Sequence, residues 1–147
     1  MQYAEGTIGR VFVLRLEDGE RLPQVIEDFA GEHQLEGAMV ILIGGVGDGS
    51  RMVGGPERQS GRGVVPLVHI LAGIQEILAV GTLFPDESGR PMLHMHGAAG
   101  REGGAAVGCT RAGMDVWLVG EVIILEIVGS GGRRKKDPGT GFQLLGF

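Results

Sequence analysis

Only one stretch of this chain spaces its apolar residues as an amphipathic helix does. Between residues 22 and 30 they recur at intervals of three and four positions, and Pro23 suits the first turn of such a helix. The other apolar segments are short runs or alternate with polar residues, as β-strands do. One helix among many strands predicts an α+β fold, with a mostly antiparallel central sheet and one main helix. The residues of the helical pattern are Leu22, Val25, Ile26, Phe29 and Ala30.

Glycine is the outlier of the composition, with 29 of the 147 residues. It permits the tight turns, bulges and close backbone approaches of a turn-rich sheet protein, although a GC-rich genome is an equally simple source. Gly44–Gly49 lacks the spacing of a G-x-G-x-x-G nucleotide-binding loop, so we expect a glycine-bulged turn there. Strands are expected at residues 7–16, 38–43, 64–71, 76–84, 92–98, 105–110, 116–127 with a break near Gly120, and 142–145.

The length suits one domain with a substantial core, and we expect residues 1–147 to form a single domain. One cysteine cannot form an intrachain disulfide, and the first residues lack the basic start and apolar stretch of a secretion signal. No apolar run is long enough to span a bilayer, so we expect a cytoplasmic protein with no membrane partner. The formal net charge of −5 argues against broad nucleic-acid binding, which normally uses a basic face.

Residues 93–96 read Leu-His-Met-His and hold the strongest chemical signal. In a strand, side chains two positions apart share a face, so His94 and His96 point the same way. If residues 100–103 form a hairpin turn with the middle two at its tip, His94 lies directly opposite Cys109. Two imidazoles and a thiolate then converge, a ligand set suited to zinc or another divalent transition metal. A surface or interface pair of histidines is the alternative.

Two further features carry ionisable side chains. His69 lies between apolar residues and is interpreted as a hydrogen-bonded or interface histidine rather than a metal ligand. A compact basic run beside Asp137 is interpreted as a solvated loop, with contacts to phosphate as the alternative. This run consists of Arg133, Arg134, Lys135 and Lys136.

Several of these stretches together resemble the PPC domain (plant and prokaryote conserved domain) in its free-standing prokaryotic form. Each motif is short, but they occur in the family's order along nearly the whole chain. The matching segments are Arg15-Leu16 with Gly19-Glu20, residues 43–48, residues 76–83, the strand of His94 and His96, residues 119–124 and residues 140–145.

The resemblance implies a single α+β domain that assembles as a homotrimer. Members of the family commonly carry a third histidine after the H-x-H strand, in the pattern D-G-x-x-x-G-G-H, and some bind zinc through the three histidines. Cys109 stands at the position of that histidine, while Glu102 replaces the aspartate and Val107 the first paired glycine. Because cysteine is also a zinc ligand, the resemblance implies either a metal site with altered preference or a degenerate one.

The resemblance also frames the function. In plants, PPC domains are joined to minor-groove hooks and act in transcription, and the domain itself serves oligomerisation and partner binding. This chain has no such hook, so we expect a small trimeric DNA-binding, transcription-associated or regulatory module, with indirect contact to DNA. The alternative is a metal-dependent enzyme with a three-ligand zinc site, for which Glu76 or Glu121 would serve as general base.

Overall fold

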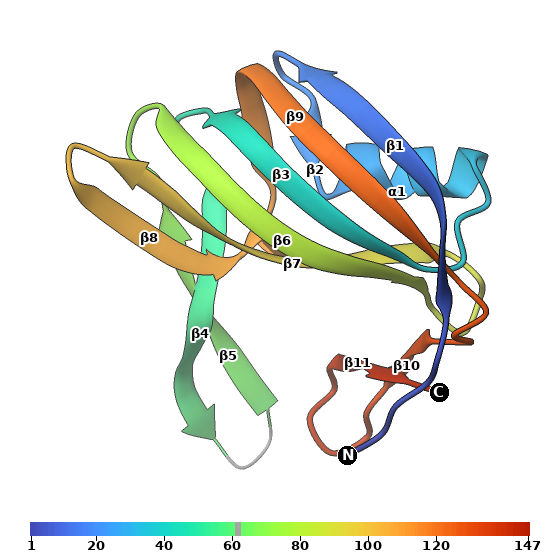
Figure 1. Cartoon of the computed structure of the whole chain (residues 1–147). Helices are drawn as coiled ribbons and strands as arrows, with labels where there is room; N and C mark the ends of the chain where they lie inside the picture. Colours follow the sequence, from blue (N-terminus) through green and yellow to red (C-terminus); the bar gives the residue numbers. More distant parts are fainter. Residues whose placement is uncertain (61–62) are drawn as a thin grey trace.

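The computed structural model describes residues 1–60 and 63–147, and its main element is one nine-stranded antiparallel sheet (Figure 1). Eight of its strands follow the order β1-β9-β3-β6-β7-β8-β4-β5, and β2 pairs with β9. The strands of the sheet are β1 (Thr7–Glu17), β2 (Arg21–Leu22), β3 (Ala38–Val46), β4 (Arg51–Ser60), β5 (Gly63–Ile70), β6 (Gln75–Pro85), β7 (Pro91–Arg101), β8 (Gly104–Cys109) and β9 (Met114–Val128). The remaining elements are α1 (Gln24–Glu32), the 3₁₀ turn η1 (Thr110–Ala112), and the two-stranded ribbon of β10 (Arg133–Lys136) and β11 (Gln143–Gly146).

The helix α1 covers one face of the sheet and creates the hydrophobic core there. Its apolar stripe buries Ile26 and Ala30 completely. The carboxylate of Glu27 accepts a hydrogen bond of 2.8 Å from the backbone N–H of Leu93, which ties the helix to β7. Burying each large aliphatic side chain stabilises the fold by about 1.5–3 kcal/mol. The sheet contributes to this core Leu16, Val40, Leu42, Leu83, Leu93, Met95, Val122 and Ile124, among others.

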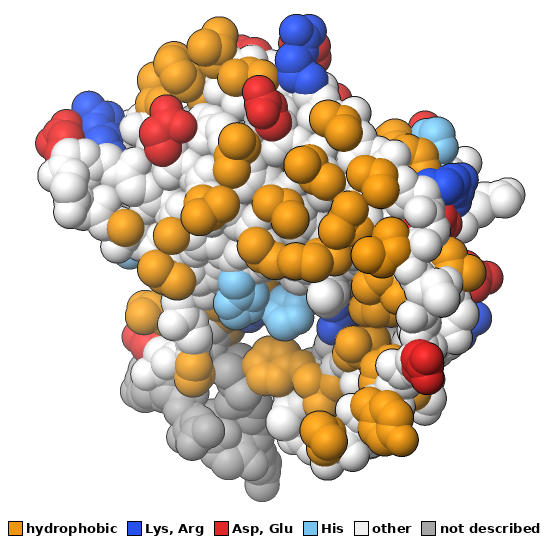
Figure 2. Space-filling model, in the orientation of Figure 1, with side chains coloured by type: hydrophobic (Ala, Val, Ile, Leu, Met, Phe, Trp, Pro, Cys, Tyr) orange, Lys and Arg blue, Asp and Glu red, His pale blue; other side chains and the backbone are white. Residues whose placement is uncertain are grey.

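The opposite face of the sheet, here called the outer face, is apolar and exposed. In β1, β3, β6, β8 and β9 the residues that alternate with the core residues point to this side, and Figure 2 shows the apolar side chains there as a broad orange area. Their exposed fractions range from 42% for Ile123 to 79% for Val13. A monomeric protein rarely exposes so continuous an apolar surface. The outer face includes Val11, Val13, Ile43, Leu78, Val80, Val107 and Ile123.

The predicted α+β fold with a mostly antiparallel sheet and one main helix is confirmed. The predicted break near Gly120 is wrong, because β9 continues to Val128. The irregularity is a bulge: Leu118 has a φ of 63°, and the register with β3 shifts between Gly44 and Gly45. The strand β4 is absent from the prediction because glycines and a proline interrupt its apolar residues. Within the described residues, no helix has both the length and the apolar character needed to cross a membrane.

Candidate metal centre

The two histidines of β7 lie side by side on the outer face, as the alternation predicts. Leu93 and Met95 are 5% and 1% exposed, and their packing in the core fixes which way the strand faces. The Nε2 atoms of His94 and His96 are 3.0 Å apart, and the two ring planes make an angle of 79°. Figure 2 shows two touching pale-blue histidine side chains at the margin of the orange area, beside a hollow.

Cys109 lies on the same face, but the hairpin that brings it there has a different register from the predicted one. In the structure Cys109 pairs with His96, not with His94. The turn is centred on Glu102 and Gly103, whose φ values are 54° and 80°. Positive φ at both central positions is the mark of a type I′ turn, which favours glycine at the second. The turn therefore lies one residue later than predicted.

The displaced turn preserves the candidate site. Moving the centre of a hairpin by one residue changes each cross-strand partner by two positions, and side chains alternate between faces with a period of two. Cys109 consequently stays on the face of the histidines. The Glu-Gly pair is the signal in the sequence that identifies this turn, since it puts a glycine, which adopts positive φ without strain, at the second central position.

The three donor groups are close enough to bind one ion. One ligand atom from each of His94, His96 and Cys109 lies within 4.8 Å of the other two. A tetrahedral zinc ion with bonds of about 2.0–2.3 Å separates its ligand atoms by about 3.3–3.6 Å, so shifts of about 1 Å complete the geometry. Cys109 is 1% exposed and forms no disulfide, whereas both histidines are exposed. This set of three residues is called the metal cluster below.

Burial and positive charge both lower the pKa of the two imidazoles. Desolvation is the larger cause for His94, followed by the charges of Arg134 and Arg111. Desolvation also leads for His96, followed by the charges of His94 and Arg111. Metals bind the neutral form of imidazole, and these shifts keep both rings in that form at neutral pH.

The basic run forms strand β10 instead of the predicted solvated loop, and Arg134 is buried, with 3% exposure. Its Nη2 donates hydrogen bonds to the carbonyl and the hydroxyl oxygen of Thr82, at 3.1 and 2.7 Å. Burial lowers the pKa of Arg134. No feature of the sequence indicates that Arg134 is buried, because four consecutive cations are typical of a solvated segment. The exposed residues of the run are Arg133, Lys135 and Lys136.

The two carboxylates considered as general bases lie apart from the metal cluster. Glu121 is on β9, three strand spacings from β7, or about 14 Å. Glu76 pairs with Gly100, four residues along β7 from His96, or about 13 Å. Neither carboxylate reaches the histidines within this chain.

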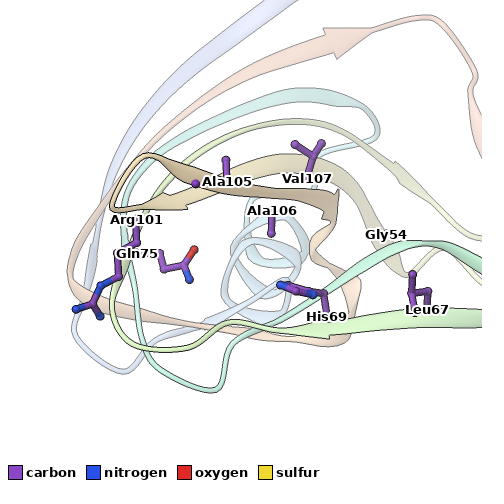
Figure 3. A pocket seen from close by; sticks show the side chains of 9 residues that line it. Gly54, Leu67, His69, Gln75, Arg101, Ala105, Ala106 and Val107 are labelled. Carbon is purple, nitrogen blue, oxygen red and sulfur yellow. The ribbon is translucent and has the colours of Figure 1, made fainter.

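A separate open pocket of about 450 Å³ lies between β5 and the hairpin of β7 and β8 (Figure 3). His69 and Gln75 point into this pocket, and Arg101 lies at one end of it. None of the metal cluster's residues lines it. His69 therefore lies outside the metal cluster, as the sequence predicts.

Comparisons with known proteins agree on the fold. A protein of Archaeoglobus fulgidus described as metal-containing is 26% identical, with a TM-score of 0.83 and full coverage of both chains. A plant- and prokaryote-conserved (PPC) protein of Pyrococcus horikoshii is 21% identical, with a TM-score of 0.78 over 98% of this chain and 97% of that one. A protein of Ralstonia eutropha JMP134 that is described as a proposed DNA-binding protein is 21% identical. Its TM-score is 0.71, over 92% of this chain and 90% of that one.

No curated protein matches the chain. Residues 3–128 match the Plants and Prokaryotes Conserved (PCC) domain, which is the PPC domain that the sequence motifs resemble. This match spans most of the chain and includes every strand of the large sheet and the whole metal cluster. The chain therefore belongs to the PCC (PPC) domain family.

Proposed function

We propose that this protein is a metal-binding regulatory module whose His94, His96 and Cys109 hold one zinc ion or another divalent transition metal. The convergence of the three donor atoms within 4.8 Å carries the proposal. Imidazole and thiolate are the ligands that zinc prefers, and the lowered pKa of both histidines keeps them in the binding form. The protein of Archaeoglobus fulgidus that shares this fold is described as metal-containing, which supports the assignment.

The test is the metal content of protein purified without an affinity tag. We expect about one metal ion per chain in the wild type and loss of it in His94→Ala and Cys109→Ser, because each change removes a donor. His69→Ala is the matched control, since this exposed histidine lies outside the metal cluster. An unchanged metal-to-chain ratio in both cluster variants would reject the metal centre.

The module is proposed to act as a homotrimer of one domain spanning residues 1–147. The exposed apolar outer face supports assembly, because such a surface is stabilised when another chain covers it. The ribbon of β10 and β11 follows the matched residues 3–128, and its Arg134 is bonded to Thr82 of the sheet, which supports one continuous domain. Leu78→Lys should lower the mass in sedimentation equilibrium from three chains towards one. Glu87→Lys, in an exposed turn, is the control, and a monomeric wild type would refute the trimer.

A role in transcription is proposed through partners rather than through broad contact with DNA. The name of the protein of Ralstonia eutropha proposes DNA binding, whereas this chain carries a net charge of −5. The candidate phosphate contacts on β10 are the exposed Arg133, Lys135 and Lys136. Direct binding would appear as a salt-dependent shift of duplex DNA at micromolar protein. Its absence at physiological salt would leave only the indirect role.

A metal-dependent enzyme is the second candidate function. Three protein ligands leave the fourth coordination position of a zinc ion to water, and two of these ligands, the histidines, are exposed to solvent. The test is hydrolysis of an activated ester by metal-loaded protein, compared with His94→Ala. Equal rates for the two proteins would reject this candidate.

A further inference from the structure

The guanidinium group of Arg134 lies beside the metal cluster. Its Nη2 donates to the hydroxyl of Thr82 at 2.7 Å, and Thr82 is directly opposite His94 in the pairing of β6 with β7. Directly opposed side chains stand about 5 Å apart on one face of a sheet. The hydrogen bond therefore places the guanidinium next to the His94 ring. Figure 2 shows blue Lys or Arg atoms beside the two pale-blue histidines.

A second arginine, Arg111, follows on the turn η1, which is attached to β7. The hydroxyl of Thr110 donates to the carbonyl of Met95, between the two histidines, at 3.3 Å, which fastens η1 to β7. The next residue, Arg111, is exposed, and its charge acts on both histidines. Among the described side chains, neither Arg111 nor Arg134 forms an ion pair. The arginines that do pair with carboxylates are Arg10, Arg15, Arg21, Arg90 and Arg101.

The Nε atom of Arg134 lacks a hydrogen-bond partner in the described part of the chain, although it is buried. Buried donors on charged groups are nearly always satisfied, because leaving one unpaired is costly. The flat fork of a guanidinium fits the oxygens of a carboxylate or phosphate. An oxyanion is the class of partner whose charge and shape suit this guanidinium group.

We propose that Arg134, beside His94, together with Arg111 binds a small anionic ligand through a carboxylate or phosphate group. The two guanidinium groups supply the charge and the N–H donors, and the histidines form the adjoining wall. The proposal deepens the proposed function, since a divalent ion in the metal cluster adds positive charge at the same place and strengthens the binding. The arginines alone are sufficient for weaker binding.

The experiment is a calorimetric titration of the full chain with inorganic phosphate, first after chelator treatment and then with one zinc ion per chain. We expect binding in both forms and tighter binding with zinc. Arg111→Gln should weaken binding by about tenfold, the effect of losing one charge-assisted hydrogen bond. Arg134→Lys should also weaken it, because lysine keeps the charge but loses the fork. Arg133→Gln, an exposed neighbour on the same strand, should bind as the wild type does.

The outcomes separate this site from the metal centre. If the zinc-loaded wild type does not bind phosphate, the anion site is overturned and the metal centre is unaffected. If the chain binds phosphate but takes up no zinc, the anion site is supported and the metal centre is rejected. Equal weakening by Arg133→Gln and Arg111→Gln also overturns it, since the attraction is then unspecific. If Arg134→Lys fails to give a folded circular dichroism spectrum, Arg111→Gln and its control decide. If succinate displaces the bound phosphate, the site accepts both carboxylates and phosphates. If succinate does not displace it, the site is specific for phosphate.

Discussion

The ion pair of Arg10 and Glu126 should make the stability of the protein depend on acid in a predictable way. The carboxylate of Glu126 accepts hydrogen bonds from the backbone N–H, the Nε and the Nη2 of Arg10, at 2.8, 2.8 and 2.7 Å. These contacts lower the pKa of Glu126 from 4.5 to about 2. The folded state therefore releases this proton more readily than the unfolded state does. The stabilisation is complete above pH 4.5 and is lost as the pH falls towards 2.

The size of this effect follows from the pKa and the exposure. A tenfold change in acidity corresponds to about 1.4 kcal/mol, so the lowered pKa of Glu126 sets an upper limit of about 3 kcal/mol. The side chain of Arg10 is 51% exposed and is screened by water. We therefore expect Glu126→Gln to lower the free energy of unfolding at pH 7 by about 1–2 kcal/mol.

The assay is urea unfolding at one fixed protein concentration, at pH 7 and at pH 3. The wild type should lose more stability than Glu126→Gln between these two pH values, because the variant has no carboxyl group to protonate. Glu17→Gln is the matched control: its ion pair with Arg15 is exposed at both ends and screened by water, so its loss should change stability little. Equal pH dependence in the wild type and Glu126→Gln would refute the reasoning.

Three further predictions follow from the neighbourhood of β7. Met95→Ala should cost about 2–5 kcal/mol in chemical unfolding, because it empties a fully buried position, and a cost below about 1 kcal/mol would contradict this packing. Gly81→Ala should reduce zinc affinity in calorimetry, because its Cβ would stand 2.8 Å from the backbone oxygen of His94 and displace β7; unchanged affinity would count against it. Arg111→Gln should raise the pKa of His94 and His96 in an NMR titration, since it removes a positive charge that lowers both; a lower or unchanged pKa would contradict that cause.

The sequence predicts the candidate site better than it predicts the register that builds it. The alternation of residues 93–96 suffices to place both histidines on one face, because side chains two positions apart in a strand point the same way. The pairing with Cys109 depends on the position of the turn, and a displacement by one residue alters every partner while preserving the face. The family pattern contains the correct turn, since its D-G pair falls on Glu102 and Gly103.

The surroundings of the metal cluster were beyond prediction for a different reason. Arg134 reaches the histidines through Thr82, a contact between residues 52 positions apart, and no local pattern encodes such a contact. Its burial depends on the ribbon of β10 and β11 folding back towards β6 (Figure 1). The residue type itself predicts an exposed side chain, because arginine is almost never buried without a partner. Only tertiary structure shows that one member of a basic run differs from the other three.

The metal cluster lies entirely within the hairpin of β7 and β8, between residues 94 and 109. Its three donors are therefore close in the chain even before the sheet assembles, so an unfolded chain retains part of its attraction for metal. A ligand that also binds the unfolded state raises stability by less than its affinity for the native protein suggests. Arg134 joins the histidines only when the ribbon has docked on β6. Metal uptake thus reports on the hairpin, whereas anion binding reports on completion of the whole domain.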